Sequence, residues 1–185
     1  MQRESWQRLS RAQEHYERFG FQYIDVPWTV EERIADITTP IHCSYVYYKD
    51  EILVGSAEQS FLQLFPKLDG RNYYAITPCF RDEKEVSALN RPYFMKLELF
   101  SRSTSDLEFI KNVAQMFFEK ELGWRKKKNL VRDFIEIDTN TFLTDEDLIY
   151  KGIELGSYGY RKHKDMEWVY GTGLAEPRFS TAYSL

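Results

Sequence analysis

Two apolar segments, residues 72–80 (NYYAITPCF) and 92–100 (PYFMKLELF), flank a polar connection and constrain the fold more than any other feature of the chain. Both have the aromatic and β-branched content of strands, and the connection is too short to hold the crossover helix that parallel strands need. The sequence therefore predicts an antiparallel pair. Arg81, which follows the first segment directly, also fits an ordinary hairpin, because charged residues solvate a turn.

Patterns along the rest of the chain predict the other elements. Helical spacing of apolar residues indicates helices over 4–19 and 103–122, and Gly20 is expected to end the first. Further helices are expected from Ser56, whose hydroxyl is a suitable cap, and within 174–185. Other strands are expected at 21–28, as a pair around 49–51, and at 130–138, 148–160 and 166–173. We expect an α+β fold with an antiparallel sheet of about six strands flanked by helices.

Composition narrows the class of protein. A length of 185 residues fits one domain, 1–185. No apolar run approaches the ~20 residues of a membrane span and the N-terminus lacks an apolar signal region, so we expect a cytoplasmic protein. A net charge of −4 argues against a domain that binds nucleic acid through its phosphates. The basic run 125–128 is more typical of a solvated surface. Cys43 and Cys79 have no metal-ligand spacing and are expected to be reduced residues in or near the core.

Three segments in a fixed order resemble the motifs of the class II aminoacyl-tRNA synthetase catalytic domain. The first is FGFQYIDVP, which follows a helix and ends at Pro27. The second is FRDE (80–83) with YFMKLE (93–98), and the third is GTGLAEPR (171–178). The resemblance covers about residues 18 to 180 and is nearest to the aspartyl, asparaginyl and lysyl branch and to the seryl and prolyl branch. It implies a single catalytic domain over 1–185, with no anticodon-binding domain expected. It implies a homodimer with Pro27 at the interface, because an unpaired strand edge would otherwise be exposed.

The resemblance assigns the catalytic roles to two arginines. Bringing a carboxylate to the α-phosphate of ATP joins two anions, which a guanidinium fork can bridge, and Arg81 takes that role. Arg178 takes the family's second role, on the γ-phosphate, although Pro177 before it departs from the usual motif. For Arg81, a surface salt bridge with Asp82 or Glu83 remains an alternative.

The same resemblance implies four further ATP contacts and one more possible one. Phe94 would stack on the adenine ring while Glu83 bonds its edge, and Gly171 and Gly173 would leave room on the other face of the base. Arg91, in the hairpin loop, is a possible additional contact with ATP. An ordinary core position is the alternative for Phe94.

Further residues are implied for magnesium and for the substrate. The segment DLIYKGIELG resembles a family strand that binds Mg²⁺ through its glutamate, here Glu154, with Glu136 or Asp147 as a possible second carboxylate. The amino-acid site would use Arg81, Glu98 of the second motif, and Glu58 or Gln59 from LVGSAEQSF. Exposed positions are the alternatives: strand-edge solvation for the magnesium carboxylates, and a helix N-terminal position for Glu58.

These residues imply an ATP- and Mg²⁺-dependent ligase. It would activate an amino acid or a similar small carboxylate as an acyl-adenylate and pass it to an acceptor other than a conventional tRNA. Two alternatives remain: a non-catalytic paralogue that senses an amino acid or regulates a partner, and a minimal aminoacyl-tRNA synthetase. Phosphate and metal ligands favour catalysis, because a sensor does not need them. The identity of the carboxylate does not follow from the sequence.

Overall fold

The computed structural model describes residues 3–40, 43–126, 129–135 and 142–184. The helices are α1 (Arg3–Arg18), α2 (Glu32–Ala35), α3 (Ala57–Leu64), α4 (Leu107–Lys126) and α5 (Arg178–Ser184). The strands are β1 (Gln22–Tyr23), β2 (Thr29–Val30), β3 (Val46–Tyr48), β4 (Glu51–Leu53), β5 (Tyr73–Phe80), β6 (Tyr93–Ser101), β7 (Leu130–Ile135), β8 (Phe142–Tyr150), β9 (Ile153–His163) and β10 (Met166–Glu176). No helix in these ranges combines the length and the apolar character that crossing a membrane requires.

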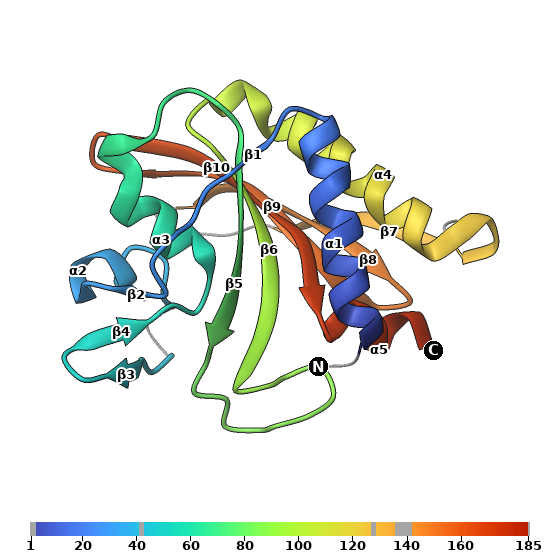
Figure 1. Cartoon of the computed structure of the whole chain (residues 1–185), viewed down its shortest axis with the longest axis horizontal. Coiled ribbons are helices and arrows are strands. Elements are labelled where there is room, and N and C mark those ends of the chain that lie inside the picture. The colour runs from blue at the N-terminus through green and yellow to red at the C-terminus, as the bar shows by residue number, and fades with distance from the viewer. Residues whose placement is uncertain (1–2, 41–42, 127–128, 136–141, 185) are drawn as a thin grey trace.

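A seven-stranded sheet forms the centre of the molecule, in the order β1-β5-β6-β10-β9-β8-β7 (Figure 1). Its pairs are antiparallel apart from the short parallel pairing of β1 with β5 at one edge. A second sheet of β2, β4 and β3 lies beside it, near α2 and α3. The predicted α+β class with an antiparallel sheet flanked by helices is confirmed.

Side-chain alternation along the central strands divides the interior into two cores. On β5, Tyr74 belongs to the core under α1 and α4, whereas its neighbours Tyr73 and Ala75 belong to the core under α3. On β10, Val169 belongs to the core under α1 and α4, and Tyr170 belongs to the core under α3. Successive strand side chains point to opposite faces, so the sheet is covered by helices on both sides. The α3 side also holds the small sheet and leaves room for a pocket, described below.

Several predicted boundaries are shifted by a few residues, as in α4, which begins at Leu107, and two strand predictions differ more. The strand expected over 148–160 is two strands, β8 and β9, because Lys151 and Gly152 form a tight turn with φ of 51° and 77°. The strand expected over 21–28 is reduced to β1, and Pro27 lies between β1 and β2. The expected edge position is correct, since β1 is the last strand of the sheet.

The first motif and the residues around it carry exposed aromatic side chains. Trp6, Tyr23 and Trp28 are each about half exposed. Pro27 is partly buried, and its carbonyl oxygen accepts a hydrogen bond of 2.6 Å from Ser60 Oγ. Pairing of two chains through this motif remains a prediction.

Candidate active site

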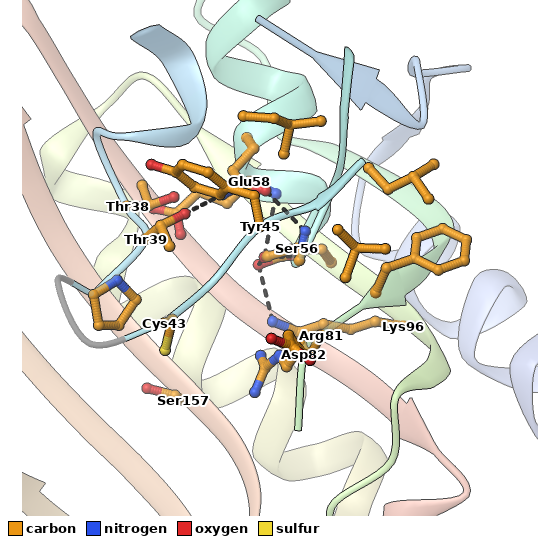
Figure 2. A pocket seen from close by; sticks show the side chains of 18 of the residues that line it. Thr38, Thr39, Cys43, Tyr45, Ser56, Glu58, Arg81, Asp82, Lys96 and Ser157 are labelled. Atoms are coloured by element: carbon orange, nitrogen blue, oxygen red, sulfur yellow. Dashed lines mark hydrogen bonds and ion pairs between the residues drawn. The ribbon is translucent and has the colours of Figure 1, made fainter. Parts of the chain in front are cut away.

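A pocket of about 350 Å³ opens on the α3 side of the central sheet, between the sheet and the segment 38–46 (Figure 2). Its walls come from parts of the chain that are far apart in sequence. Seven of the predicted site residues line it: Glu58, Gln59, Arg81, Glu83, Glu98, Glu154 and Arg178. The second and third sequence motifs therefore meet in the pocket, together with residues of α3 and β9.

The second-motif hairpin presents Arg81 at the pocket. Antiparallel pairing places Cys79 opposite Phe94, and the backbone N–H of Arg81 donates to the Pro92 carbonyl at 2.9 Å. The Arg81 guanidinium lies 5.1 Å from the centre of the Phe94 ring. Among the described residues, neither Asp82 nor Glu83 forms an ion pair with Arg81, so the salt-bridge alternative does not apply here. A guanidinium held on an aromatic face keeps its N–H donors available for an anionic ligand.

Two of the expected second-motif residues lie away from the pocket wall. Phe94 is partly buried and belongs to neither core, so the alternative of an ordinary core position is not supported. Its ring contributes through the contact with Arg81 rather than as a lining residue. Arg91 is exposed in the hairpin loop and does not line the pocket. Their roles in binding ATP stay predictions.

Glu98 is a fully buried carboxylate at the floor of the pocket. Ser56 Oγ lies 2.8 and 2.6 Å from its two oxygens, and Lys96 Nζ lies 3.0 Å from one of them. Ser56 also caps α3, as predicted, by accepting from the backbone N–H of Glu58. Burial of a carboxylate requires such partners, since an unpaired charge away from water is costly. The cap and the carboxylate thus fix the start of α3 against β6.

Glu58 is buried, with 3% of its surface exposed, which rules out the alternative of an exposed helix N-terminal residue. Arg161 Nη1 donates to one of its oxygens at 2.6 Å and Trp168 Nε1 to the other at 2.7 Å. The Arg161 guanidinium also lies 3.8 Å from the centre of the Tyr170 ring. Burial raises the pKa of the Glu58 carboxyl, and the charge of Arg161 opposes that shift.

Gln59 supports the pocket through both ends of its amide. Its Oε1 accepts from the Gly55 backbone N–H at 2.9 Å, and its Nε2 donates to Thr39 Oγ1 at 2.9 Å. These bonds join the start of α3 to the segment that covers the pocket. In this arrangement Gln59 holds the wall in place, and direct contact with a substrate remains a prediction.

Glu154 and Arg178 meet at the far side of the pocket. Arg178 is the first residue of α5, and its Nη1 donates to Glu154 Oε1 at 2.9 Å. Asp147 is buried on β8 opposite Ser157 of β9 and does not line the pocket, and Glu136 lies outside the described residues. In the described ranges no three His, Cys, Asp or Glu side chains form a metal-binding group. A magnesium ion here would use Glu154 and oxygens of a bound phosphate, a donor set that this cation accepts.

Comparison with known proteins gives matches in structure only. No protein-family model and no curated protein sequence matches the chain. The pyrrolysyl-tRNA synthetase PylSc of Desulfitobacterium hafniense matches with a TM-score of 0.76 and 14% identity, over 97% of this chain and 68% of that one. A second pyrrolysyl-tRNA synthetase structure from that organism gives 0.71 and 13%, over 97% and 69%. Seryl-tRNA synthetase from Pyrococcus horikoshii, complexed with ATP, gives 0.73 and 18%, over 95% and 49%.

The chain has a class II aminoacyl-tRNA synthetase-like fold. The fold predicted from the three motifs is confirmed. Because the identities are low, the likeness establishes the architecture of this class II-like domain and leaves its activity to be argued from its own residues.

The third-motif glycines of the class II-like domain face the core under α1 and α4. A Cβ on Gly173 would come within 2.4 Å of Leu97 and 2.8 Å of Tyr16, and one on Gly171 within 2.9 Å of Ile110. The space that they leave is therefore filled by core side chains under α1 and α4. Thr172, between them, is the residue that lines the pocket. Contact of the two glycine backbones with adenine remains a prediction.

Several pocket residues of the class II-like domain were not predicted from the sequence. Lys96, Arg161, Tyr170 and Thr172 all line the pocket. The signal for Lys96 was present, since it lies two residues before Glu98 and must share its face of the strand. No comparable signal marks Arg161, whose partner Glu58 is 103 residues away.

Proposed function

We propose that this protein is an ATP-dependent ligase that activates an amino acid or a similar small carboxylate as an acyl-adenylate. The observation that carries the proposal is the convergence of Arg81, Arg178 and Glu154 on one pocket from three distant parts of the chain. The seryl-tRNA synthetase with the same fold was solved with ATP, which supports a nucleotide in this position.

The proposed reaction needs the charges that these residues supply. A carboxylate oxygen attacks the α-phosphorus of ATP, a P–O bond to the β-phosphate breaks, and pyrophosphate leaves. Arg81 would bridge the attacking carboxylate and the α-phosphate, where negative charge develops. Arg178 would stabilise the γ-phosphate. Glu154 would hold Mg²⁺, which neutralises phosphate charge when it is bound.

The substrate end of the pocket would lie at Glu58 and Glu98. Both carboxylates are buried and both have a cationic partner, Arg161 and Lys96 respectively. Glu98 is the better candidate for a substrate ammonium group, because the flexible lysine can move away more readily than the arginine held by Glu58 and Tyr170. The pocket wall also carries hydroxyl groups from Thr38, Thr39 and Ser157. These groups suit a polar substrate.

We further propose that the acceptor of the activated acid is not a conventional tRNA, because the net charge of −4 is unfavourable for a polyanionic partner. A minimal aminoacyl-tRNA synthetase remains the second enzymatic candidate, since the structures with the same fold are tRNA synthetases. A non-catalytic sensor would bind the carboxylate without needing Arg178 or Glu154.

ATP–pyrophosphate exchange with each amino acid and with a set of small organic acids, in the presence of Mg²⁺, tests the proposal. Adenylate formation predicts exchange that depends on one acid or a few related acids. Loss of that exchange in the Arg81→Ala variant assigns it to this pocket. If no acid stimulates exchange but one of them raises the melting temperature, the sensor function replaces the catalytic one.

A further inference from the structure

Strand β6 presents three side chains in a row on the α3 side of the sheet: Phe94, Lys96 and Glu98. They alternate with Met95 and Leu97, which pack on the core under α1 and α4. Side chains two residues apart on a strand lie on one face at a spacing of about 7 Å. The resemblance implies that the base of ATP stacks on Phe94, and the proposed function places the substrate's amino end at Glu98. Lys96 lies between these two ends, where the α-phosphate and the carboxylate must meet.

The Lys96 ammonium belongs to the pocket and not to the surface. Only 12% of its side chain is exposed, and its Nζ bonds to Glu98 at 3.0 Å (Figure 2). Arg81 also lines the pocket and directly follows β5, the strand that pairs with β6. Burial raises the pKa of the neighbouring Cys79 thiol to about 11; the charges of Lys96 and Arg81 act against that rise, and the charge of Glu98 adds to it.

We propose that Lys96 is a second cation of the adenylation centre, binding the α-phosphate beside Arg81. This assignment rests on the proposed function. A lysine suits the position because its ammonium is a compact charge on a flexible stem, so it can leave Glu98 and reach a phosphate oxygen without moving the strand. Arg81 supplies the planar fork for two anions, and Lys96 supplies further charge at the phosphorus.

The exchange of partners links the two ends of the pocket. In the structure Lys96 neutralises the buried carboxylate of Glu98. When Lys96 turns to the α-phosphate, Glu98 loses its counter-ion and becomes an acceptor for the ammonium group of an amino acid. Nucleotide binding thus prepares the substrate site, and the two ligands bind cooperatively.

The alternative is that Lys96 serves only as the counter-ion of Glu98. Adenosine and AMP separate the two roles, because they share the base and the ribose and differ in the α-phosphate alone. The ratio of their dissociation constants, measured by calorimetry on the whole chain, reports the contribution of that phosphate. We would measure the ratio for wild type, Lys96→Met and Lys96→Gln. The glutamine keeps a side-chain N–H donor for Glu98 and loses the charge, so it covers the case in which the methionine variant does not fold.

Binding of the phosphate by Lys96 predicts that wild type prefers AMP and that both variants lose about tenfold of this preference, as expected for a charge-assisted hydrogen bond. Adenosine affinity should change little. Lys67→Met is the matched control, because Lys67 is exposed and lies outside the pocket. An unchanged AMP preference in folded Lys96 variants would overturn the assignment and leave the proposed function standing. A wild-type protein that binds neither ligand, or shows no preference for AMP, would overturn both.

Discussion

Arg178 and Glu154 form an ion pair at one side of the pocket, with Nη1 2.9 Å from Oε1, although 24 positions separate them in the chain. In the proposed function the arginine binds the γ-phosphate and the glutamate binds Mg²⁺. Each group therefore holds the other in the structure, and both would bind their ligands only when the pair opens. The pair is partly exposed, so opening it has a modest cost.

The first prediction is that Mg²⁺ and ATP bind this site cooperatively through Glu154. In wild type, millimolar Mg²⁺ should tighten ATP binding about tenfold, a coupling within the usual range between linked sites. Glu154→Gln should remove most of this effect, because the neutral amide is a poor magnesium ligand. Calorimetric titration of ATP with and without Mg²⁺ measures the coupling. Glu167→Gln is the control, since Glu167 pairs with Lys162 on the surface. Equal coupling in wild type and Glu154→Gln would exclude Glu154 as the ligand.

The second prediction separates the two arginines. Arg81→Lys keeps the positive charge but loses the planar fork that bridges carboxylate and phosphate, so pyrophosphate exchange should fall about 10²- to 10³-fold. Arg178→Lys should be less harmful, because the γ-phosphate needs charge more than it needs a fork. Exchange rates and melting temperatures of both purified variants decide the matter. If Arg81→Lys retains near wild-type exchange, the hairpin is an ordinary structural one.

The sequence predicted the parts of this site that depend on local order. Arg81 follows a strand directly and Ser56 precedes a helix. The residues next to them in the sequence mark the end of that strand and the start of that helix, and so determine where Arg81 and Ser56 lie. It did not predict which groups would pair. Glu58 with Arg161, and Glu154 with Arg178, come from different strands and helices, and their contacts depend on how the elements pack. The turn at Gly152 was visible in the sequence, but the apolar pattern on both sides favoured one long strand.

The third prediction concerns a buried ion pair behind the pocket. Arg8 of α1 bonds to Glu176, which is fully buried at the end of β10, and to Ser180 Oγ of α5 at 2.8 Å. Arg8→Ala leaves a buried carboxylate without its partner, which typically costs about 3 to 5 kcal/mol of unfolding free energy. Because Glu176 lies two residues before Arg178, the loss should also weaken ATP binding in the protein that remains folded.

Denaturant unfolding of Arg8→Ala measures the loss, and Arg18→Ala is the control, since Arg18 on the same helix is largely exposed. The double variant Arg8→Met with Glu176→Leu removes both charges and should regain much of the stability, because apolar side chains of similar volume often replace a buried pair without loss. An Arg8→Ala protein as stable as wild type would contradict a structural role for this pair.

The fourth prediction concerns the two cysteines, which differ in exposure: the expected core position is correct for Cys79 and wrong for Cys43. Cys43 is exposed at the mouth of the pocket, whereas Cys79 is fully buried and burial raises the pKa of its thiol to about 11. An aromatic disulfide reagent at pH 8 should therefore modify Cys43 alone in the native protein, because only a thiolate within reach reacts. Cys79 should react after unfolding in guanidinium. Cys43→Ser should abolish the native reaction, and rapid labelling of that variant would mean that Cys79 is accessible.

The last prediction is a pH dependence of stability that originates at His15. The imidazole is buried between Tyr16, Phe19 and Phe117, and its Nε2 lies 2.9 Å from the Val113 carbonyl oxygen, so in the neutral form this N–H donates. Burial lowers the pKa of His15 below its usual value of 6.5. Below that pH the unfolded chain therefore binds a proton more readily than the folded one.

The contribution of His15 is fully present above pH 6.5, the usual pKa of an unfolded imidazole, and is lost as the pH falls through 6.5 toward the lower folded-state pKa. We expect the urea midpoint of wild type to decrease between pH 7.5 and 5.5. His15→Gln, which keeps a side-chain N–H donor but does not titrate, should show a smaller decrease over the same interval. His163→Gln is the control, because His163 lies at the end of β9, away from this core. If wild type and His15→Gln lose stability equally on acidification, another group is responsible for the pH dependence.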